Sequence, residues 1–222
     1  MIYSKKTMNI IFGIFGLAIL AIAAFAIFVV GTENTQFERN AKIADYNPGK
    51  SQGSKVLVVY FSRSNNTELM AMEIANHYEA DLIRLYADKY RIGFRGWLNA
   101  LSDAQTKHAA ITPEKIDLSP YETIFVGSPI WWYSPAPPAW QFVNNNNIAN
   151  KNIVLFNTFN SKFKQEYIDD FKANIEDKNG YFVKHIYVKR ERMSQQISAE
   201  TLLEKVRQQL IMLPSMRPRE AM

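Results

Sequence analysis

The chain contains no cysteine among its 222 residues, so neither disulfide bonds nor thiol catalysis is available to it. It also lacks the glycine-rich motifs GxGxxG and GxxxxGK[ST], which argues against a dinucleotide-binding fold and a P-loop nucleotidase. Its histidines, His77, His108 and His185, are far apart and have no metal-ligand spacing, which indicates structural or solvated side chains. The net charge is only +5, and basic and aromatic residues are not interleaved, so nucleic-acid binding is not expected. The sequence therefore predicts no metal site, and it shows no evident catalytic acid or base.

One long apolar run lies near the N-terminus. Residues 8–30 carry no charge, and Asn9 is their only strongly polar side chain. As a helix with a rise of about 1.5 Å per residue they span roughly 35 Å, enough to cross a hydrocarbon core of about 30 Å. A cleaved signal peptide has a shorter apolar region, and a buried helix of a soluble protein would have a polar face. We therefore expect a single transmembrane helix, with a signal peptide as the alternative.

The charges beside this run favour one orientation weakly. Lys5 and Lys6 lie directly before it, whereas Arg39 and Lys42 follow at a greater distance. The positive-inside rule then places the N-terminus in the cytoplasm and the rest of the chain outside. The expected organisation is an N-terminal tail (1–7), a transmembrane helix (8–30), a polar linker (31–53), one α/β domain (54–213) and a C-terminal tail (214–222).

Strand and helix signals alternate after residue 54. Strands are expected at residues 56–61, 81–86, 123–127, 152–156 and 181–188. Helices are expected at residues 66–78, 94–107, 139–143 and 164–175, and after a cap at Ser198. This alternation predicts a parallel sheet with right-handed crossovers. Ligands bind such sheets beyond the carboxyl ends of the strands, so the loops after the first, third and fourth strands should meet.

The first of these loops is crowded with polar groups. It joins an apolar strand to an amphipathic helix and contains Ser62, Arg63, Ser64, Asn65, Asn66 and Thr67. Residues of these types are ordinary helix N-caps, but one cap needs only one of them. A polar loop between a strand and a helix N-terminus indicates phosphate binding, because free N–H groups and the helix dipole favour an anion there.

The second loop combines prolines with aromatic side chains. It contains Pro129, Ile130, Trp131, Trp132 and Tyr133. Prolines limit the entropy lost on binding, and flat rings suit stacking on a planar ligand. The alternative is that these aromatics belong to the domain core. Because adjacent residues point in different directions, one tryptophan can be core while the other is not.

The third loop mixes hydroxyl, amide and aromatic groups. It contains Thr158, Phe159, Asn160 and Ser161, which either supply donors to a polar ring edge or simply cap a helix. Two further segments are less informative. The crossover with Tyr90, Phe94 and Trp97 either covers a planar substrate or is a packed helix. The basic residues Lys189, Arg190 and Arg192 are expected in a solvated loop, with an anionic partner as the alternative.

Three segments, VLVVYFSRSNNT, IFVGSPIWWYSPAP and ITPEKIDLSPYETIF, together with the strand order, resemble the flavodoxin family over residues 54–213. The resemblance implies a doubly wound α/β domain with a five-stranded parallel sheet, ordered 2-1-3-4-5, and bound FMN. It implies that Ser62, Ser64, Asn66 and Thr67 hold the phosphate, that residues 129–132 line the flavin ring, and that residues 158–161 form the third flavin loop. The chain departs from relatives at Asn65, where glycine is frequent, and at Phe159, Asn160 and Lys162, in a loop that is often rich in glycine and serine.

The function implied is that of a membrane-anchored FMN protein acting in electron transfer or flavin-dependent reduction, with the chemistry carried by the cofactor. Whether the chain is an enzyme or a carrier stays open. The alternatives are an NAD(P)H- or quinone-linked oxidoreductase on the same fold, and a flavin-free binding module. The expected partners are the membrane, through residues 8–30, and either a redox partner or a small planar substrate. The slightly positive domain argues against the acidic steering of small flavodoxins.

Overall fold

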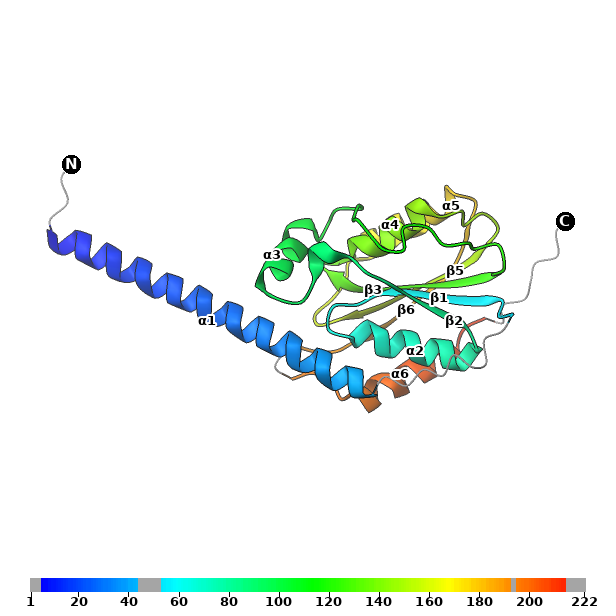
Figure 1. The fold of residues 1–222 in the computed structure, drawn as a ribbon, viewed down its shortest axis with the longest axis horizontal. Coiled ribbons are helices and arrows are strands. Elements are labelled where there is room, and N and C mark those ends of the chain that lie inside the picture. The colour runs from blue at the N-terminus through cyan, green and yellow to red at the C-terminus, as the bar shows by residue number, and fades with distance from the viewer. Residues whose placement is uncertain (1–4, 44–52, 193–194, 215–222) are drawn as a thin grey trace.

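A parallel sheet forms the centre of the molecule (Figure 1), which the computed structural model describes over residues 5–43, 53–192 and 195–214. Its five long strands lie in the order β2-β1-β3-β5-β6 with parallel neighbours, so the predicted order 2-1-3-4-5 is confirmed. They are β1 (Val56–Phe61), β2 (Asp81–Leu85), β3 (Thr123–Trp131), β5 (Asn152–Phe159) and β6 (Tyr181–Lys189). A sixth strand, β4 (Ser134–Pro135), pairs antiparallel with the end of β3 and was not predicted.

Helices cover both faces of this sheet (Figure 1). One face carries α2 (Asn66–Tyr78) and α6 (Ala199–Ile211). The other carries α3 (Phe94–Asp103), α4 (Pro137–Asn145) and α5 (Gln165–Glu176), with a short 3-10 helix, η2 (Asp88–Tyr90), before α3. The predicted cap is confirmed at α6, where the Ser198 hydroxyl accepts a hydrogen bond from the Thr201 N–H at 3.1 Å.

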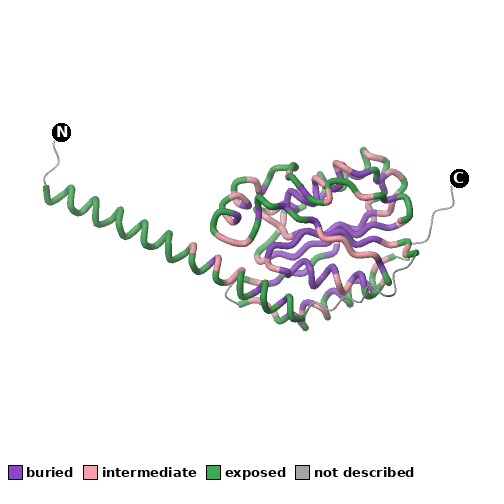
Figure 2. Tube along the Cα trace, viewed as in Figure 1, coloured by how far each residue is buried: buried purple, intermediate pink, exposed green. Residues whose placement is uncertain are grey.

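Each face of the sheet has its own hydrophobic core (Figure 2). Successive side chains of a strand point to opposite faces, so Leu57 belongs to one core and Val58 to the other. The α4 and α5 side contains Trp140 and Phe171, whose rings meet edge to face with centroids 4.8 Å apart. Burial on both faces is the reason that β1 is apolar throughout, as the sequence indicated.

One long helix, α1 (Lys5–Ile43), projects from the domain. Among the described helices it is the one that is long and apolar enough to cross a membrane, by length and composition alone. Its first part is exposed, whereas its last part packs on α2 and buries Val29, Gln36 and Asn40 (Figure 2). Residues 31–43 were expected to be linker, and the structure corrects this expectation. The helix continues through residues 31–43 because polar side chains on one of its faces contact the domain. The sequence alone does not show these contacts.

The rest of the expected linker, residues 44–52, lies outside the described residues, as do residues 1–4 of the N-terminal tail and 215–222 of the C-terminal tail. The predicted domain boundaries therefore stay predictions.

Candidate functional site

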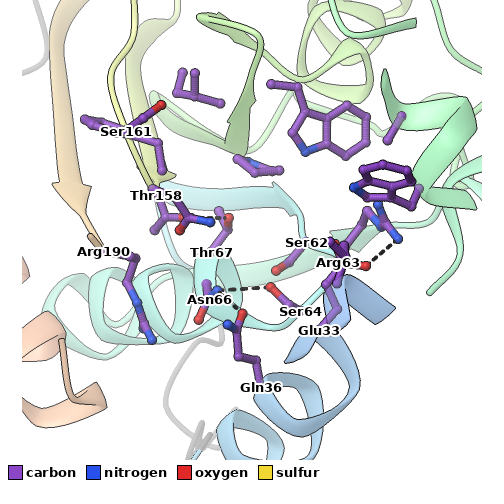
Figure 3. A pocket seen from close by; sticks show the side chains of 18 of the residues that line it. Glu33, Gln36, Ser62, Arg63, Ser64, Asn66, Thr67, Thr158, Ser161 and Arg190 are labelled. Atoms are coloured by element: carbon purple, nitrogen blue, oxygen red, sulfur yellow. Dashed lines mark hydrogen bonds and ion pairs between the residues drawn. The ribbon is translucent and has the colours of Figure 1, made fainter. Parts of the chain in front are cut away.

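A cavity of about 250 Å³ lies where the loops after β1, β3 and β5 meet (Figure 3). These are the three loops that the sequence predicted to converge. Every loop residue predicted for the site lines the cavity except Asn65 and Tyr133. The remaining walls come from α1, α3 and the residue after β6, and consist of Val29, Glu33, Gln36, Trp97, Ala100, Leu101 and Arg190. Of these, the sequence suggested a contact with a ligand or partner only for Trp97 and Arg190, each as one of two alternatives.

Asn65 shapes the polar end of this cavity through its backbone. It precedes α2 in the left-handed conformation, with φ 58°, which asparagine tolerates better than most residues. Its side chain does not cap the helix and instead accepts a hydrogen bond from Arg84 Nη2 at 3.1 Å. The N–H groups of the first turn of α2 therefore lack a side-chain cap, and that turn begins with the cavity-lining residues Asn66 and Thr67. Such a helix N-terminus favours an anion.

Hydrogen bonds between loops hold this polar end together. The Thr67 and Thr158 hydroxyl oxygens are 2.8 Å apart in a buried contact that joins the first loop to the third. Asn66 Nδ2 donates to Ser64 Oγ at 3.0 Å and to Gln36 Oε1 at 3.1 Å (Figure 3). The loop after β1 is thus held in one conformation by both β5 and α1.

Helix α1 closes this end of the cavity. Asn40, fully buried, donates from Nδ2 to Asn66 Oδ1 at 2.7 Å and to the Ser64 carbonyl at 3.0 Å. Glu33 forms a largely buried ion pair with Arg63, with Oε2 and Nη2 2.8 Å apart. The contacting residues of α1, at 29, 33, 36 and 40, follow spacings of four, three and four. That helical spacing is the signal by which the sequence could have revealed this wall.

Two buried arginines make the polar end electropositive. Arg63 is 8% exposed and Arg190 is fully buried. Burial lowers the pKa of Arg190 to about 10, with Arg39 adding to the decrease, and it also lowers the pKa of Arg63, against the attraction of Glu33. Burial raises the pKa of Glu33, which Arg63 opposes. Arg63 Nε and Arg190 Nε and Nη1 have no hydrogen-bond partner among the described residues. Buried donors are costly when left unsatisfied, so this end is suited to an anion.

The expectation that Arg190 lies in a solvated loop is wrong. Its N–H donates to the Phe159 carbonyl at 2.6 Å, and its carbonyl accepts from the Ile197 N–H at 3.1 Å. These bonds fold the chain back after β6, and the guanidinium reaches Gln196 Oε1 at 3.3 Å. The burial arises from contacts between distant segments, which a local basic run does not indicate.

Aromatic side chains form the other end of the cavity. Trp131 packs edge to face on Phe61 and Tyr90, with ring centroids 5.6 Å and 5.1 Å apart, and so belongs partly to the core. Trp132, in contrast, is 61% exposed. The two adjacent tryptophans therefore differ in environment, as their opposite directions predicted. Trp97 of α3 adds a third indole to this end.

The turn between β3 and β4 presents Trp132 at the cavity. Trp132 and Tyr133 have positive φ angles of 40° and 76°, as primed hairpin turns require, although such turns normally contain asparagine and glycine. Each non-glycine residue in this region costs on the order of 1–3 kcal/mol. The Tyr133 ring lies 5.6 Å from the ammonium groups of both Lys162 and Lys164, outside the cavity. The strained turn thus places the indole of Trp132 at the cavity.

Beneath the loops, a chain of hydrogen-bonded polar groups, buried at Asn157 and Ser128 and half-buried at His185, connects β6, β5 and β3. His185 Nε2 lies 2.9 Å from Asn157 Oδ1, and Asn157 Nδ2 donates to the Ser128 carbonyl at 2.7 Å. Burial lowers the pKa of His185 to about 4, so the ring is neutral at pH 7. Because Asn157 offers its oxygen, the His185 proton is assigned to Nε2. His185 has a structural role, one of the two that the sequence allowed.

A family model described as flavodoxin matches residues 55–199, well over half of the chain, and the chain therefore belongs to the flavodoxin family. Among solved structures, a candidate flavoprotein from Bacteroides uniformis ATCC 8492 is 22% identical, with a TM-score of 0.53 over 70% of this chain and 99% of that one. A candidate flavoprotein from Bacteroides eggerthii DSM 20697 is 21% identical, with a TM-score of 0.53 over 72% of this chain and 98% of that one. At these identities the likeness concerns the fold alone. No curated protein matches the sequence.

Proposed function

We propose that the chain is a membrane-anchored flavoprotein that binds FMN and acts in electron transfer or flavin-dependent reduction. The observation that carries this proposal is one cavity with two unlike ends. An uncapped helix N-terminus and buried arginine donors without partners form one end, and three tryptophans form the other. Membership of the flavodoxin family supports a flavin over other molecules that join an anion to a planar ring.

The polar end suits the phosphate in charge as well as in donors. Among the residues that line the cavity, Arg63 and Arg190 contribute two positive charges against the one negative charge of Glu33, which leaves a net charge of +1. The first turn of α2 adds N–H groups and the positive end of its dipole. The side chains proposed to hold the phosphate are Ser62, Ser64, Asn66 and Thr67.

The aromatic end suits the ring. The volume of about 250 Å³ is just below the roughly 300–1,000 Å³ of typical small-molecule sites, so a ring reaching the mouth remains partly accessible. Residues 129–132 and 158–161 are proposed to border it. FMN, when bound, supplies the redox chemistry, and these residues set its orientation and access. Asn65 and Tyr133 contribute through the backbone geometry of their loops rather than from the cavity wall.

An NAD(P)H- or quinone-linked oxidoreductase is the second candidate. The exposed indole of Trp132 at the cavity favours it, since a flat apolar surface there suits a planar substrate. Oxidation of NADH, NADPH or a quinol by the purified FMN-loaded chain alone would establish this reading. A carrier would instead require a separate reductase.

Helix α1 is proposed to anchor the chain through residues 8–30, whose side chains are largely exposed. The flanking charges favour, weakly, a domain outside the cytoplasm. Protease added to intact, wall-stripped cells should then remove the domain and leave a short anchor in the membrane. Protection until the membrane is permeabilised would place the domain in the cytoplasm.

The cofactor is tested on the full chain purified in detergent. Absorbance should show the visible flavin bands, and chromatography of the released compound should identify FMN. A preparation without bands that also fails to bind added FMN would favour a flavin-free binding module.

A further inference from the structure

Helix α3 departs from the usual pattern of a soluble domain on one of its faces. Its buried residues are the small ones, Gly96 and Ala100. Two of its large apolar residues face outward, with Phe94 45% exposed and Leu98 44% exposed, whereas Trp97 and Leu101 are half-buried. A surface helix of a soluble domain normally turns its large apolar residues to the core. The outer face of α3 is therefore suited to an apolar environment.

This apolar face lies against the anchor helix. Trp97 packs edge to face on Phe25 of α1, with ring centroids 6.0 Å apart. A second cavity, of about 310 Å³, lies between residues 21–26 of α1 and the side chains of Phe94, Trp97 and Leu98. Figure 1 shows α3 as the part of the domain that reaches furthest along α1 toward its N-terminus.

The contact has a definite depth relative to the apolar run of α1. That run ends at Val30, so Phe25 lies about 7.5 Å and Ala21 about 13.5 Å from its end along the helix axis. A run of about 35 Å centred on a core of about 30 Å leaves some 2.5 Å outside at each side. The residues of α1 beside α3 are therefore roughly 3–11 Å inside the hydrocarbon boundary. Amphipathic helices that lie on membranes bury their apolar face by about 5–10 Å.

Basic residues border the same face. Arg91, just before α3, and Arg95, in its first turn, are both exposed. At 100° per residue, Arg95 lies beside the stripe formed by Phe94 and Leu98. Arg91 pairs with the exposed Asp88, whereas cations at the position of Arg95 suit an anionic lipid headgroup.

We propose that α3 is a second membrane contact, lying in the headgroup–acyl boundary with Phe94 and Leu98 in lipid and Arg91 and Arg95 among the headgroups. The inference rests on the membrane anchoring proposed above. Trp97 lines both this contact and the flavin cavity, together with Ala100 and Leu101 on the cavity side. The aromatic end of the cavity is thereby held one helix away from the bilayer.

The absence of cysteine allows a direct test with single labelled sites. Leu98→Cys is spin-labelled in the full chain and reconstituted into nanodiscs of phosphatidylcholine with an anionic phosphatidylglycerol fraction. The collision rate of the label with oxygen, which partitions into lipid, is compared with its collision rate with a water-soluble nickel chelate. The expected oxygen-to-nickel ratio is severalfold higher than for a label at Lys172→Cys on α5, an exposed control away from α1. A ratio equal to that of the Lys172 label would overturn the proposal.

Two controls separate this inference from the proposed function. A label at Ile14→Cys reports whether the apolar run itself lies in lipid. If it does and the Leu98 label is in water, only the α3 contact fails, whereas a nickel-accessible Ile14 label overturns the anchor as well. Spin–spin broadening between Leu98 labels would show a second copy on this face and would also overturn the proposal. Visible absorbance of the same samples reports FMN retention independently.

Discussion

At the polar end of the cavity Thr67 is 1% exposed and Arg190 fully buried, whereas at the aromatic end Trp132 is 61% exposed. The polar end is assembled from α1, β1, β5 and the residue after β6, and hydrogen bonds between these segments fix its loop. The aromatic end depends on one short turn and on α3. If FMN binds as proposed, the polar end should therefore determine its affinity and the aromatic end its access to partners. Substitutions at the polar end should separate FMN from riboflavin, and those at the aromatic end should not.

Among single substitutions, the largest effect is expected for Arg190→Gln. Hydrogen bonds to charged groups contribute about 1.5–3 kcal/mol, so the dissociation constant of FMN should rise by about 10- to 100-fold while that of riboflavin hardly changes. The stability of the flavin-free protein should stay the same or rise, because a buried cation with unpartnered nitrogens is removed. Titration calorimetry and thermal unfolding measure the two quantities. Arg207→Gln, at an exposed arginine, is the matched control. Equal losses of affinity for FMN and riboflavin would show that Arg190 does not contact the phosphate.

Acid should lower the folding stability through His185, which lies beneath the loops, rather than through a residue that lines the cavity. The pKa of His185 is about 4 in the folded chain against 6.5 for an unperturbed histidine, so between these values the unfolded chain binds more protons. Stability is therefore complete above pH 6.5 and falls as the pH falls toward 4, by on the order of 2 kcal/mol between pH 7 and pH 5. Denaturant unfolding of the flavin-free protein should show a shallower pH dependence in His185→Gln than in the wild type. The exposed His77→Gln is the control, and a wild-type slope in His185→Gln would contradict the assignment.

Removing the part of α1 that follows the apolar run should weaken the polar end. A chain that begins at Ser54 lacks Glu33, Gln36 and Asn40, whereas a chain that begins at Gly31 keeps them without the apolar run. Both should be soluble. The shorter chain should bind FMN about tenfold more weakly, because each lost hydrogen bond contributes about 0.5–1.5 kcal/mol. Equal FMN affinity in the two chains would show that α1 does not close the site.

The smallest effect is expected at the aromatic end. Trp132→Ala should weaken FMN and riboflavin equally, by about 1 kcal/mol. If the indole stacks on the ring as proposed, it should quench flavin fluorescence, and this variant should partly restore it. Trp131→Ala should cost more folding stability, because this indole packs on Phe61 and Tyr90. Flavin emission and thermal unfolding measure both. Quenching as strong as in the wild type in both variants would show that neither tryptophan contacts the flavin ring.

The elements within the domain were predictable because their signals are local. The apolar run of β1 and the periodicity of residues 66–78 gave the first strand and helix with the bounds observed. The convergence of three loops followed from the topology of a parallel sheet rather than from any single residue. The polar loop of residues 62–67 and the tryptophans were found because hydroxyl and aromatic side chains cluster in sequence there.

The missed parts of the site depend on contacts between distant segments. Arg190 is buried only because the chain after β6 turns back through the Phe159 and Ile197 backbone bonds. Glu33 and Asn40 of α1 contact the loop after β1, although Glu33 precedes its partner Arg63 by 30 residues in the sequence. Their helical spacing was present in the sequence but was masked by the polar composition of residues 31–53. The sequence singled out Phe94 and Trp97 as a cover for a planar substrate or as part of a packed helix, but it did not show that α1 lies beside them.

The most direct test of the account compares FMN with riboflavin, which differ only by the phosphate, in the wild type and in a Ser64→Ala, Thr67→Ala double variant. The account predicts that the double variant loses on the order of 100-fold in FMN affinity and little in riboflavin affinity, since two hydrogen bonds to a charged group are removed. Circular dichroism and the thermal midpoint establish that the fold is intact. An unchanged ratio of the two dissociation constants in a folded variant would place the phosphate elsewhere and contradict the central claim.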